Sequence, residues 1–197
     1  MREADYLSSR EVPKEEAMHI IQIKRYQSPT GEMLIGTFEN RVCLCDWTKG
    51  HRRESNDRRI QKTLNAIYQE EDTELAQQVI QQLNEYFAGS RQQFDLPLLL
   101  TGTPFQNRVW QALQAIPYGE TCSYAELAQA IGNPKATRAV ASANGSNPIS
   151  ILIPCHRVIG SNHKLVGYGG GIETKRFLLE LERHNITIKD KPTVFQP

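Results

Sequence analysis

Short apolar runs dominate the first part of the chain. Residues 19–26 alternate isoleucines with polar side chains, and two further apolar runs follow at 33–38 and 42–47. The polar stretch Glu39-Asn40-Arg41 separates the last two runs and has the length of a turn. This pattern predicts a β-hairpin within an antiparallel sheet. The basic and polar residues 51–59 are predicted to form a loop.

A helix is predicted over residues 72–88, where the apolar residues change to a spacing of four. The repeating positions are Leu75, Val79, Leu83 and Phe87. That spacing places them on one face of a helix. Asp72 is predicted to cap the start of this helix, and Gly89 is predicted to end it.

The second half of the chain carries the pattern of a DNA-binding motif. Residues 103–106, Thr-Pro-Phe-Gln, combine a capping box with proline at the first helical position, which predicts a helix start. Residues 124–131 and 134–144 are predicted as two further helices, joined by the turn-forming Gly132-Asn133-Pro134. Two helices joined by such a short turn are typical of a helix-turn-helix motif.

These elements predict an α+β protein with two domains. Residues 18–101 are expected to form an N-terminal domain with a small antiparallel sheet and helices. Residues 102–188 are expected to form a mainly helical C-terminal domain, and the linker-like residues 92–102 mark the boundary. Residues 1–17 are charged and lack periodicity, so we expect a flexible arm there, with a tail at 189–197.

The composition excludes membrane-spanning and disulfide-rich proteins. Of the 197 residues, 39% are hydrophobic and 23% are charged, which are ordinary values for a globular protein. No apolar run approaches the roughly 20 residues that span a bilayer, and the charged N-terminus lacks the apolar core of a secretion signal. The four cysteines form no dense disulfide framework. We therefore expect a cytoplasmic protein with reduced cysteines.

Charge is divided unevenly along the chain. Residues 1–100 contain 13 Lys and Arg against 16 Asp and Glu, whereas residues 101–197 contain 10 against 6. This basic excess places any nucleic-acid contact in the second half. The helix there, at residues 136–146, has almost no bulky side chain except Arg138. It fits shallow docking in a DNA minor groove with one inserted side chain, but small residues equally permit close helix packing.

Cys155-His156-Arg157 is the candidate reactive segment, directly after an apolar run that ends at Pro154. Two potentially cationic neighbours are expected to lower the pKa of the Cys155 thiol and to favour the nucleophilic thiolate. The alternative is a buried, unreactive cysteine at the end of a hydrophobic strand.

Six motifs resemble, in the same order, those of the O6-alkylguanine-DNA alkyltransferases, with the bacterial stand-alone type most similar. The motifs are TPFQ at 103–106, SYAELA at 123–128, GNPKATRAV at 132–140, NGSNP at 144–148, PCHRV at 154–158 and GYGGG at 167–171. The strong resemblance covers residues 86–184, and the N-terminal part matches weakly. PCHRV is far more specific than a lone cysteine, so the resemblance favours a reactive Cys155.

The resemblance implies a catalytic role for five residues, Cys155, His156, Glu182, Asn147 and Tyr124. Cys155 matches the alkyl acceptor, His156 matches the base that activates it through a water molecule, and Glu182 matches the carboxylate that orients the histidine. Glu182 lies in a predicted helix at 174–184, where the alternative is a solvated carboxylate paired with a sequence neighbour. Asn147 matches the residue that braces the Cys155 loop against the recognition helix.

The resemblance also implies contacts to DNA and to the damaged base. The residues implied to bind DNA are Ser123, Tyr124, Ala136, Thr137 and Arg138. The Tyr124 hydroxyl is implied to donate a hydrogen bond to guanine N3, and Arg138 is implied to fill the gap left by a flipped base. The residues implied to line the base pocket are Ser150, Val158, Tyr168, Gly169 and Gly170. Some relatives have proline where this chain has Ser150, so the resemblance implies a roomier pocket here.

The fold and function that the resemblance implies follow from these roles. The N-terminal domain is expected to be ribonuclease H-like, and the C-terminal domain to be a winged helix-turn-helix. The protein is expected to act as a monomer on double-stranded DNA, and to transfer one alkyl group from O6-alkylguanine, and also from O4-alkylthymine, to its own cysteine. This transfer follows minor-groove binding and base flipping. It needs no metal and no organic cofactor.

Two other functions remain open from the sequence. A non-enzymatic helix-turn-helix sensor or regulator of DNA damage would fit the helices, although such sensors replace the acceptor cysteine. A Cys-His hydrolase would need a cysteine and histidine from separate elements, which adjacent residues fit poorly.

A metal site near Cys43, Cys45 and His51 is a further open alternative. Cysteine and histidine are zinc ligands, but no fourth ligand is evident. In a strand, residues two apart share a face, so both cysteines are expected to belong to the core. We predict no metal.

Overall fold

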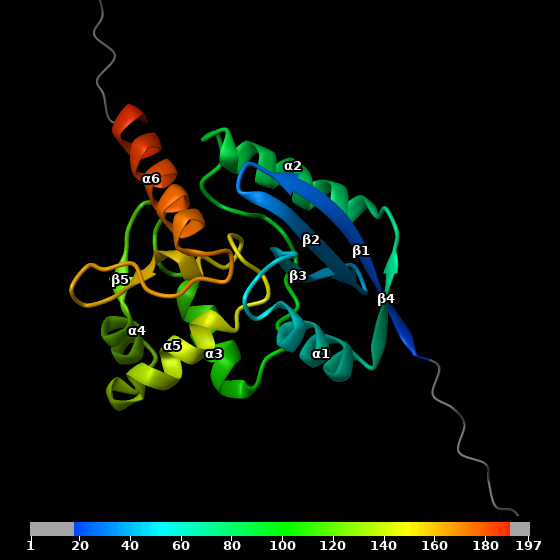
Figure 1. The fold of residues 1–197 in the computed structure, drawn as a ribbon, viewed down its shortest axis with the longest axis horizontal. Helices are drawn as coiled ribbons and strands as arrows, with labels where there is room; N and C mark the ends of the chain where they lie inside the picture. The colour runs from blue at the N-terminus through cyan, green and yellow to red at the C-terminus, as the bar shows by residue number, and fades with distance from the viewer. Residues whose placement is uncertain (1–17, 190–197) are drawn as a thin grey trace, which may run out of the picture.

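The computed structural model describes residues 18–189, so the predicted arm at 1–17 and residues 190–197 of the predicted tail lie outside the described residues. The N-terminal domain consists of β1 (His19–Ser28), β2 (Gly31–Phe38), β3 (Arg41–Trp47), α1 (Arg53–Leu64), β4 (Ala66–Glu70) and α2 (Glu74–Phe87). The C-terminal domain consists of α3 (Pro104–Leu113), β5 (Cys122–Ser123), α4 (Tyr124–Ala130), the 3-10 helix η1 (Pro134–Ala136), α5 (Thr137–Gly145), the 3-10 turn η2 (Cys155–Arg157), β6 (Val158–Ile159) and α6 (Ile172–Lys189). Figure 1 shows the sheet with α1 and α2 beside the helices of the C-terminal domain.

The N-terminal sheet has the strand order β3-β2-β1-β4. The predicted hairpin is confirmed, because β2 and β3 pair antiparallel, as do β1 and β2. The prediction of a purely antiparallel sheet is wrong, because β4 runs parallel to β1. The chain reaches β4 only after crossing through α1, and such a crossover allows a parallel pair.

Helix α1 corrects the prediction of a loop at residues 51–59. Its sequence is almost entirely polar, and its buried residues are only Asn56 and Ile60. The helix therefore lacks the apolar stripe on which the prediction relied. An ion pair one turn apart, from Arg53 to Asp57, supports it instead.

Helix α2 is confirmed, but its cap is not the predicted one. The Thr73 hydroxyl accepts a hydrogen bond from the Ala76 N–H at 3.1 Å, so Thr73 is the N-cap residue. The Asp72 carboxylate instead pairs with Lys24 on β1 and accepts from Gln77.

Apolar side chains gather on both faces of the sheet. On one face Met33 and Ile35 pack with α2 and with residues of the C-terminal domain, which form one continuous core. On the other face Ile60 of α1 packs with a smaller cluster. Cys45 belongs to the first cluster and Cys43 to the second, because the strand register shifts between β2 and β3. The prediction that the two cysteines share a face is therefore wrong, while their burial in the core is confirmed.

The C-terminal domain contains the predicted helix-turn-helix. The capping box at Thr103 and Gln106 is present, and Ser123 and Glu126 form a second one at the start of α4. The second helix of the motif begins with the short η1 and continues as α5. Trp110 of α3 supports α5 from behind, since its indole N–H donates to the Ala143 carbonyl at 2.8 Å.

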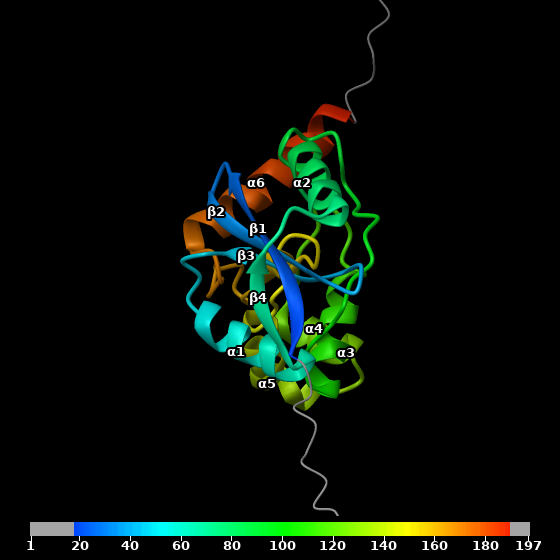
Figure 2. The ribbon, with the colours of Figure 1, turned by 90° about the vertical axis from the view of Figure 1, so that its right-hand side faces the viewer.

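The outer edge of β3, the last strand of the sheet on this side, joins the two domains. Leu99 donates its backbone N–H to the Val42 carbonyl at 2.9 Å, so the linker-like residues run along this edge. Further along, Cys45 donates to the Pro148 carbonyl at 2.9 Å, and Ser150 donates to the Cys45 carbonyl at 2.7 Å. Figure 2 shows β3 at this junction, with the C-terminal domain behind the sheet. Within residues 18–189, every helix is too short or too polar to cross a bilayer.

Candidate active site

Cys155 lies at the end of a loop that Asn147 holds in place. The Asn147 side-chain oxygen accepts from the Ile149 N–H at 3.0 Å, and its Nδ2 donates to the Ile153 carbonyl at 3.0 Å. The same Nδ2 lies 3.1 Å from the sulfur of Cys155. One amide therefore fixes the loop and contacts the candidate nucleophile, and all of these groups are buried.

Asn144 links this loop to α5. Its Nδ2 donates to the Cys155 carbonyl at 3.3 Å, a contact that the sequence analysis did not identify. Tyr124 lies beside the same two residues, and burial, together with the charge of a Cys155 thiolate, raises the pKa of its hydroxyl. The phenol therefore stays protonated and remains a hydrogen-bond donor.

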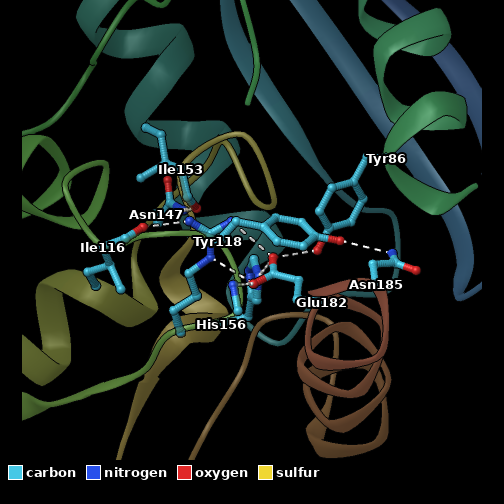
Figure 3. A network of polar contacts seen from close by, with 10 residues as sticks. Tyr86, Ile116, Tyr118, Asn147, Ile153, His156, Glu182 and Asn185 are labelled. Carbon is cyan, nitrogen blue, oxygen red and sulfur yellow. Dashed lines mark hydrogen bonds and ion pairs between the residues drawn. The ribbon is translucent and has the colours of Figure 1, made fainter. Parts of the chain in front are cut away.

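Glu182 of α6 is the centre of a buried network (Figure 3). Its Oε1 lies 2.8 Å from Nε2 of His156 and accepts from the Tyr86 hydroxyl at 2.8 Å. Its Oε2 accepts from Nε of Arg157 and from the Gly119 N–H, both at 2.9 Å. The alternative of a solvated Glu182 is therefore wrong, because this carboxylate is fully buried.

The network fixes the protonation states of its members. Burial alone would raise the pKa of Glu182, but the hydrogen bonds and charges of His156 and Arg157 outweigh it and lower that pKa to about 2. Burial lowers the pKa of His156, which favours the neutral imidazole. Since an ionised carboxylate only accepts hydrogen bonds, Nε2 of His156 carries the proton. Its Nδ1 is then the basic nitrogen, and it is buried with no partner among the described residues.

The predicted low pKa of the Cys155 thiol is wrong for the protein as it stands. Burial raises this pKa to about 11, an effect that the Asn147 hydrogen bond only partly offsets. The two neighbours do not supply the expected positive charge, because His156 favours its neutral form and Arg157 is paired with Glu182. Cys155 is therefore a neutral thiol that needs a base before it can act as a nucleophile.

The N-terminal domain contributes a carboxylate to the site that the sequence analysis missed. The Ser150 hydroxyl donates to Oδ1 of Asp46 at 3.0 Å, and both side chains are buried. Burial raises the pKa of Asp46 to about 6. Asp46 lies on β3, more than a hundred residues before Ser150, so no local pattern connects the two.

Trp47 packs against the glycine-rich loop, residues 167–171, which follows β6. Its ring meets that of Tyr168 edge-on, with ring centroids 5.4 Å apart, and Tyr168 is buried. A Cβ on Gly170 would lie 2.7 Å from the Trp47 ring, so only glycine fits there. The backbone carbonyl of Gly169 accepts from the His51 N–H at 3.2 Å.

Lys175 is a second buried charged group that the sequence analysis missed. Its Nζ donates to the carbonyl oxygens of Val158 at 2.6 Å and Val166 at 3.0 Å. Burial lowers its pKa to about 8. Lys175 thereby holds the predicted pocket residue Val158 and the start of the glycine-rich loop against α6.

The predicted DNA-binding residues lie on the helix-turn-helix, apart from the buried network. Arg138 is exposed on α5, and Ala136 and Thr137 are half-buried beside it. The Ser123 hydroxyl is engaged as the cap of α4. Tyr124 alone of this set lies close to Cys155.

The alternative of a metal site gains no support from the structure. Cys43 and Cys45 are buried in different clusters, and His51 is exposed. Within residues 18–189 no three or more His, Cys, Asp or Glu side chains gather as a metal site would require.

Two family models match the chain. Residues 22–100 match the ribonuclease-like domain of 6-O-methylguanine DNA methyltransferase, and residues 104–184 match the DNA-binding domain of the same family. The described fold agrees with this pair of domains, a sheet with helices followed by a winged helix-turn-helix.

Individual relatives agree with the family models. The chain is 64% identical over 104 residues to a methylated-DNA–protein-cysteine methyltransferase of Mycobacterium bovis, a match that covers 53% of this chain and 63% of the relative. It is 46% identical over 171 residues to the constitutive enzyme of that name from Bacillus subtilis, which covers 84% of this chain and 96% of the relative. The crystal structure of the Mycobacterium tuberculosis O6-methylguanine methyltransferase superposes with a TM-score of 0.72 at 41% identity, covering 86% of this chain and 99% of that one. The chain therefore belongs to the O6-methylguanine-DNA methyltransferase family.

Proposed function

We propose that this protein repairs DNA by moving the alkyl group of O6-alkylguanine onto Cys155, in one irreversible turnover. The observation that carries the proposal is the buried thiol of Cys155 beside the His156–Glu182 pair. A structure of a similar chain, the Mycobacterium tuberculosis OGT, was determined in complex with DNA (TM-score 0.71, 41% identity, 87% and 99% of the two chains). O4-alkylthymine is proposed as a second substrate, because it presents an alkyl group on an equivalent oxygen.

The proposed chemistry is an in-line displacement at the alkyl carbon. Nδ1 of His156 takes the thiol proton through a water molecule, and Glu182 stabilises the imidazolium that forms. The Cys155 thiolate then attacks the alkyl carbon, so that a carbon–sulfur bond forms while the carbon–oxygen bond breaks. The leaving guanine accepts a hydrogen bond at N3 from the Tyr124 hydroxyl and takes up one proton, which balances the thiol proton that His156 received. The thioether on Cys155 is stable, and no metal or organic cofactor takes part in these steps.

The helix-turn-helix is proposed to deliver the damaged base from double-stranded DNA as a monomer. The α5 surface docks in the minor groove, where its small side chains allow close approach. The damaged nucleotide rotates out of the helix, which costs a few kcal/mol, and Arg138 fills the gap. Ser150, Val158, Tyr168 and the glycine-rich loop are proposed to surround the extruded base.

The proposed function predicts a strict stoichiometry. Protein titrated with an excess of duplex DNA that contains one O6-methylguanine should remove one methyl group per molecule and then stop. Counting repaired strands against active protein distinguishes the alternatives, because a hydrolase turns over many times and a sensor not at all. Repair that continues beyond one equivalent contradicts a permanent thioether.

Arg138→Ala should slow repair of duplex DNA by roughly tenfold, because part of the few kcal/mol that extrusion costs is no longer offset. Reaction with free O6-alkylguanine base needs no extrusion and should be unchanged. The two rate constants are measured in parallel under single-turnover conditions. Arg108→Ala is the matched control, since Arg108 is an exposed arginine on α3. Equal losses on both substrates would rule out the proposed role of Arg138.

A further inference from the structure

The buried network around Glu182 receives one hydrogen bond from the N-terminal domain. Tyr86 lies near the end of α2, and its hydroxyl donates to Oε1 of Glu182, 96 residues later in the chain, at 2.8 Å. Figure 3 shows Tyr86 and His156 reaching Glu182 from different elements. Tyr86, His156 and Glu182 are each fully buried, so no bulk solvent competes for these bonds.

Tyr86 and His156 share the same carboxylate oxygen. Oε1 accepts from Tyr86, lies 2.8 Å from Nε2 of His156, and also accepts from Nη2 of Arg157 at 3.0 Å. A carboxylate oxygen offers about two lone pairs. Three donors therefore share one carboxylate oxygen. The hydrogen bond from Tyr86 weakens the hydrogen bond that the same oxygen accepts from His156.

The tyrosine is held so that it remains a donor. Its ring meets those of Phe87, Phe94 and Tyr118, with centroid distances of 5.5, 5.6 and 6.1 Å. Burial and the neighbouring Glu182 charge raise its pKa well above the ordinary value. The phenol is therefore neutral at any pH at which the protein works, and its ring cannot turn the hydroxyl away without disturbing its neighbours.

We propose that Tyr86 is a positioning residue for alkyl transfer, through which the N-terminal domain limits how strongly Glu182 holds the protonated form of His156. This inference rests on the proposed function, in which His156 is the base for Cys155. Tyr86 does not touch the reacting atoms and acts only through Glu182.

Other charged and titratable groups also face the imidazole or its carboxylate partner. They are Arg157 and Cys155 of η2, Lys175 of α6, Tyr168 of the glycine-rich loop, and Tyr118 after α3. All of these groups remain in the protein when the Tyr86 hydroxyl alone is removed, so the variant tests that one hydrogen bond.

Tyr86→Phe should move the acidic limb of the rate–pH profile to higher pH by about half a unit, as loss of one hydrogen bond to a carboxylate would. Without the tyrosine proton, more of the Glu182 charge acts on His156, and the imidazole keeps its proton to higher pH. Two readouts are measured. One is the single-turnover transfer rate from methylated duplex DNA across pH. The other is the NMR titration of the His156 ring protons in the protein without DNA.

Tyr118→Phe is the matched control. Its hydroxyl accepts from the Asn185 side chain at 3.0 Å rather than contacting Glu182, and its ring belongs to the same aromatic cluster. Both readouts should stay in place in this variant. An unshifted His156 titration in folded Tyr86→Phe, or an equal shift in Tyr118→Phe, overturns the proposal.

A second variant tests the proposal even if Tyr86→Phe is destabilised. Tyr86→3-fluorotyrosine retains the ring and makes its hydroxyl a stronger donor, so the His156 titration should move to lower pH. A shift in the same direction as Tyr86→Phe contradicts the competition at Oε1. Because the NMR readout needs no DNA, it also separates the two ideas. If the wild-type protein fails to transfer alkyl groups, the proposed function falls, while the titration still decides the role of Tyr86.

Discussion

Cys155→Ser should abolish alkyl transfer while DNA binding stays intact. A serine hydroxyl is almost never ionised near neutral pH and is a far weaker nucleophile than a thiolate. The substitution preserves the loop, because the hydroxyl can accept the Asn147 hydrogen bond that the sulfur accepts now. Transfer is measured as the repaired fraction of methylated duplex DNA, and binding as fluorescence anisotropy of the same duplex.

Peptide mass analysis of the wild-type protein completes this experiment. After reaction, the added methyl should be on tryptic peptide 139–157, which contains Cys155, and not on 109–135, which contains Cys122. Cys122→Ser is the matched control variant, since Cys122 is a free, half-buried cysteine outside the buried network. Repair by Cys155→Ser, or a methyl group on the second peptide, would falsify the assignment of the acceptor.

Glu182→Gln should destabilise the protein by about 3–5 kcal/mol, the usual cost of removing one partner from a buried ion pair. All the groups around this side chain donate hydrogen bonds, so the amide of a glutamine would place a donor against donors. Arg157 would also be left as a buried charge without its carboxylate. Transfer should slow by about a hundredfold in the folded variant, because His156 loses the partner that stabilises its protonated form.

The stability difference should depend on pH in a defined direction. The pKa of Glu182 is lowered from an ordinary value of 4.5 to about 2 in the folded protein, so its charge contributes stability above pH 4.5. That contribution declines as the pH falls from 4.5 and is lost below about 2. Guanidinium unfolding at several pH values measures it. Glu180→Gln, on the exposed side of α6, is the control and should change stability by less than about 0.5 kcal/mol. Equal stability of the two variants contradicts the buried role of Glu182.

The sequence predicted best what is local. The capping box at Thr103 and the stripe of α2 depend on residues within a few positions of one another, and both are confirmed. Helix α1 was missed because its buried face is made by Asn56 and Ile60 rather than by a repeat of apolar residues. The pairing of β4 with β1 depends on a crossover that no short pattern reveals.

In the candidate site, too, local features were predictable and contacts between distant parts of the chain were not. Cys155, His156 and Glu182 could be chosen from a resemblance, but the pKa of the thiol could not be inferred from its sequence neighbours. Arg157 is adjacent in the chain, yet its charge is paired with Glu182. Asp46 and Tyr86 come from the N-terminal domain, and only the fold brings them to the site.

The pairing along the outer edge of β3 has a consequence for how this chain can vary in evolution. Main-chain groups of Cys45 anchor the segment at Pro148 and Ser150, and main-chain hydrogen bonds survive almost any exchange of side chains. The backbone part of this junction therefore tolerates side-chain exchange, whereas the contacts of Asp46, Trp47 and Tyr86 depend on those side chains. The same pairing occupies a strand edge that would otherwise be open to a foreign strand, so it also protects the protein from aggregation.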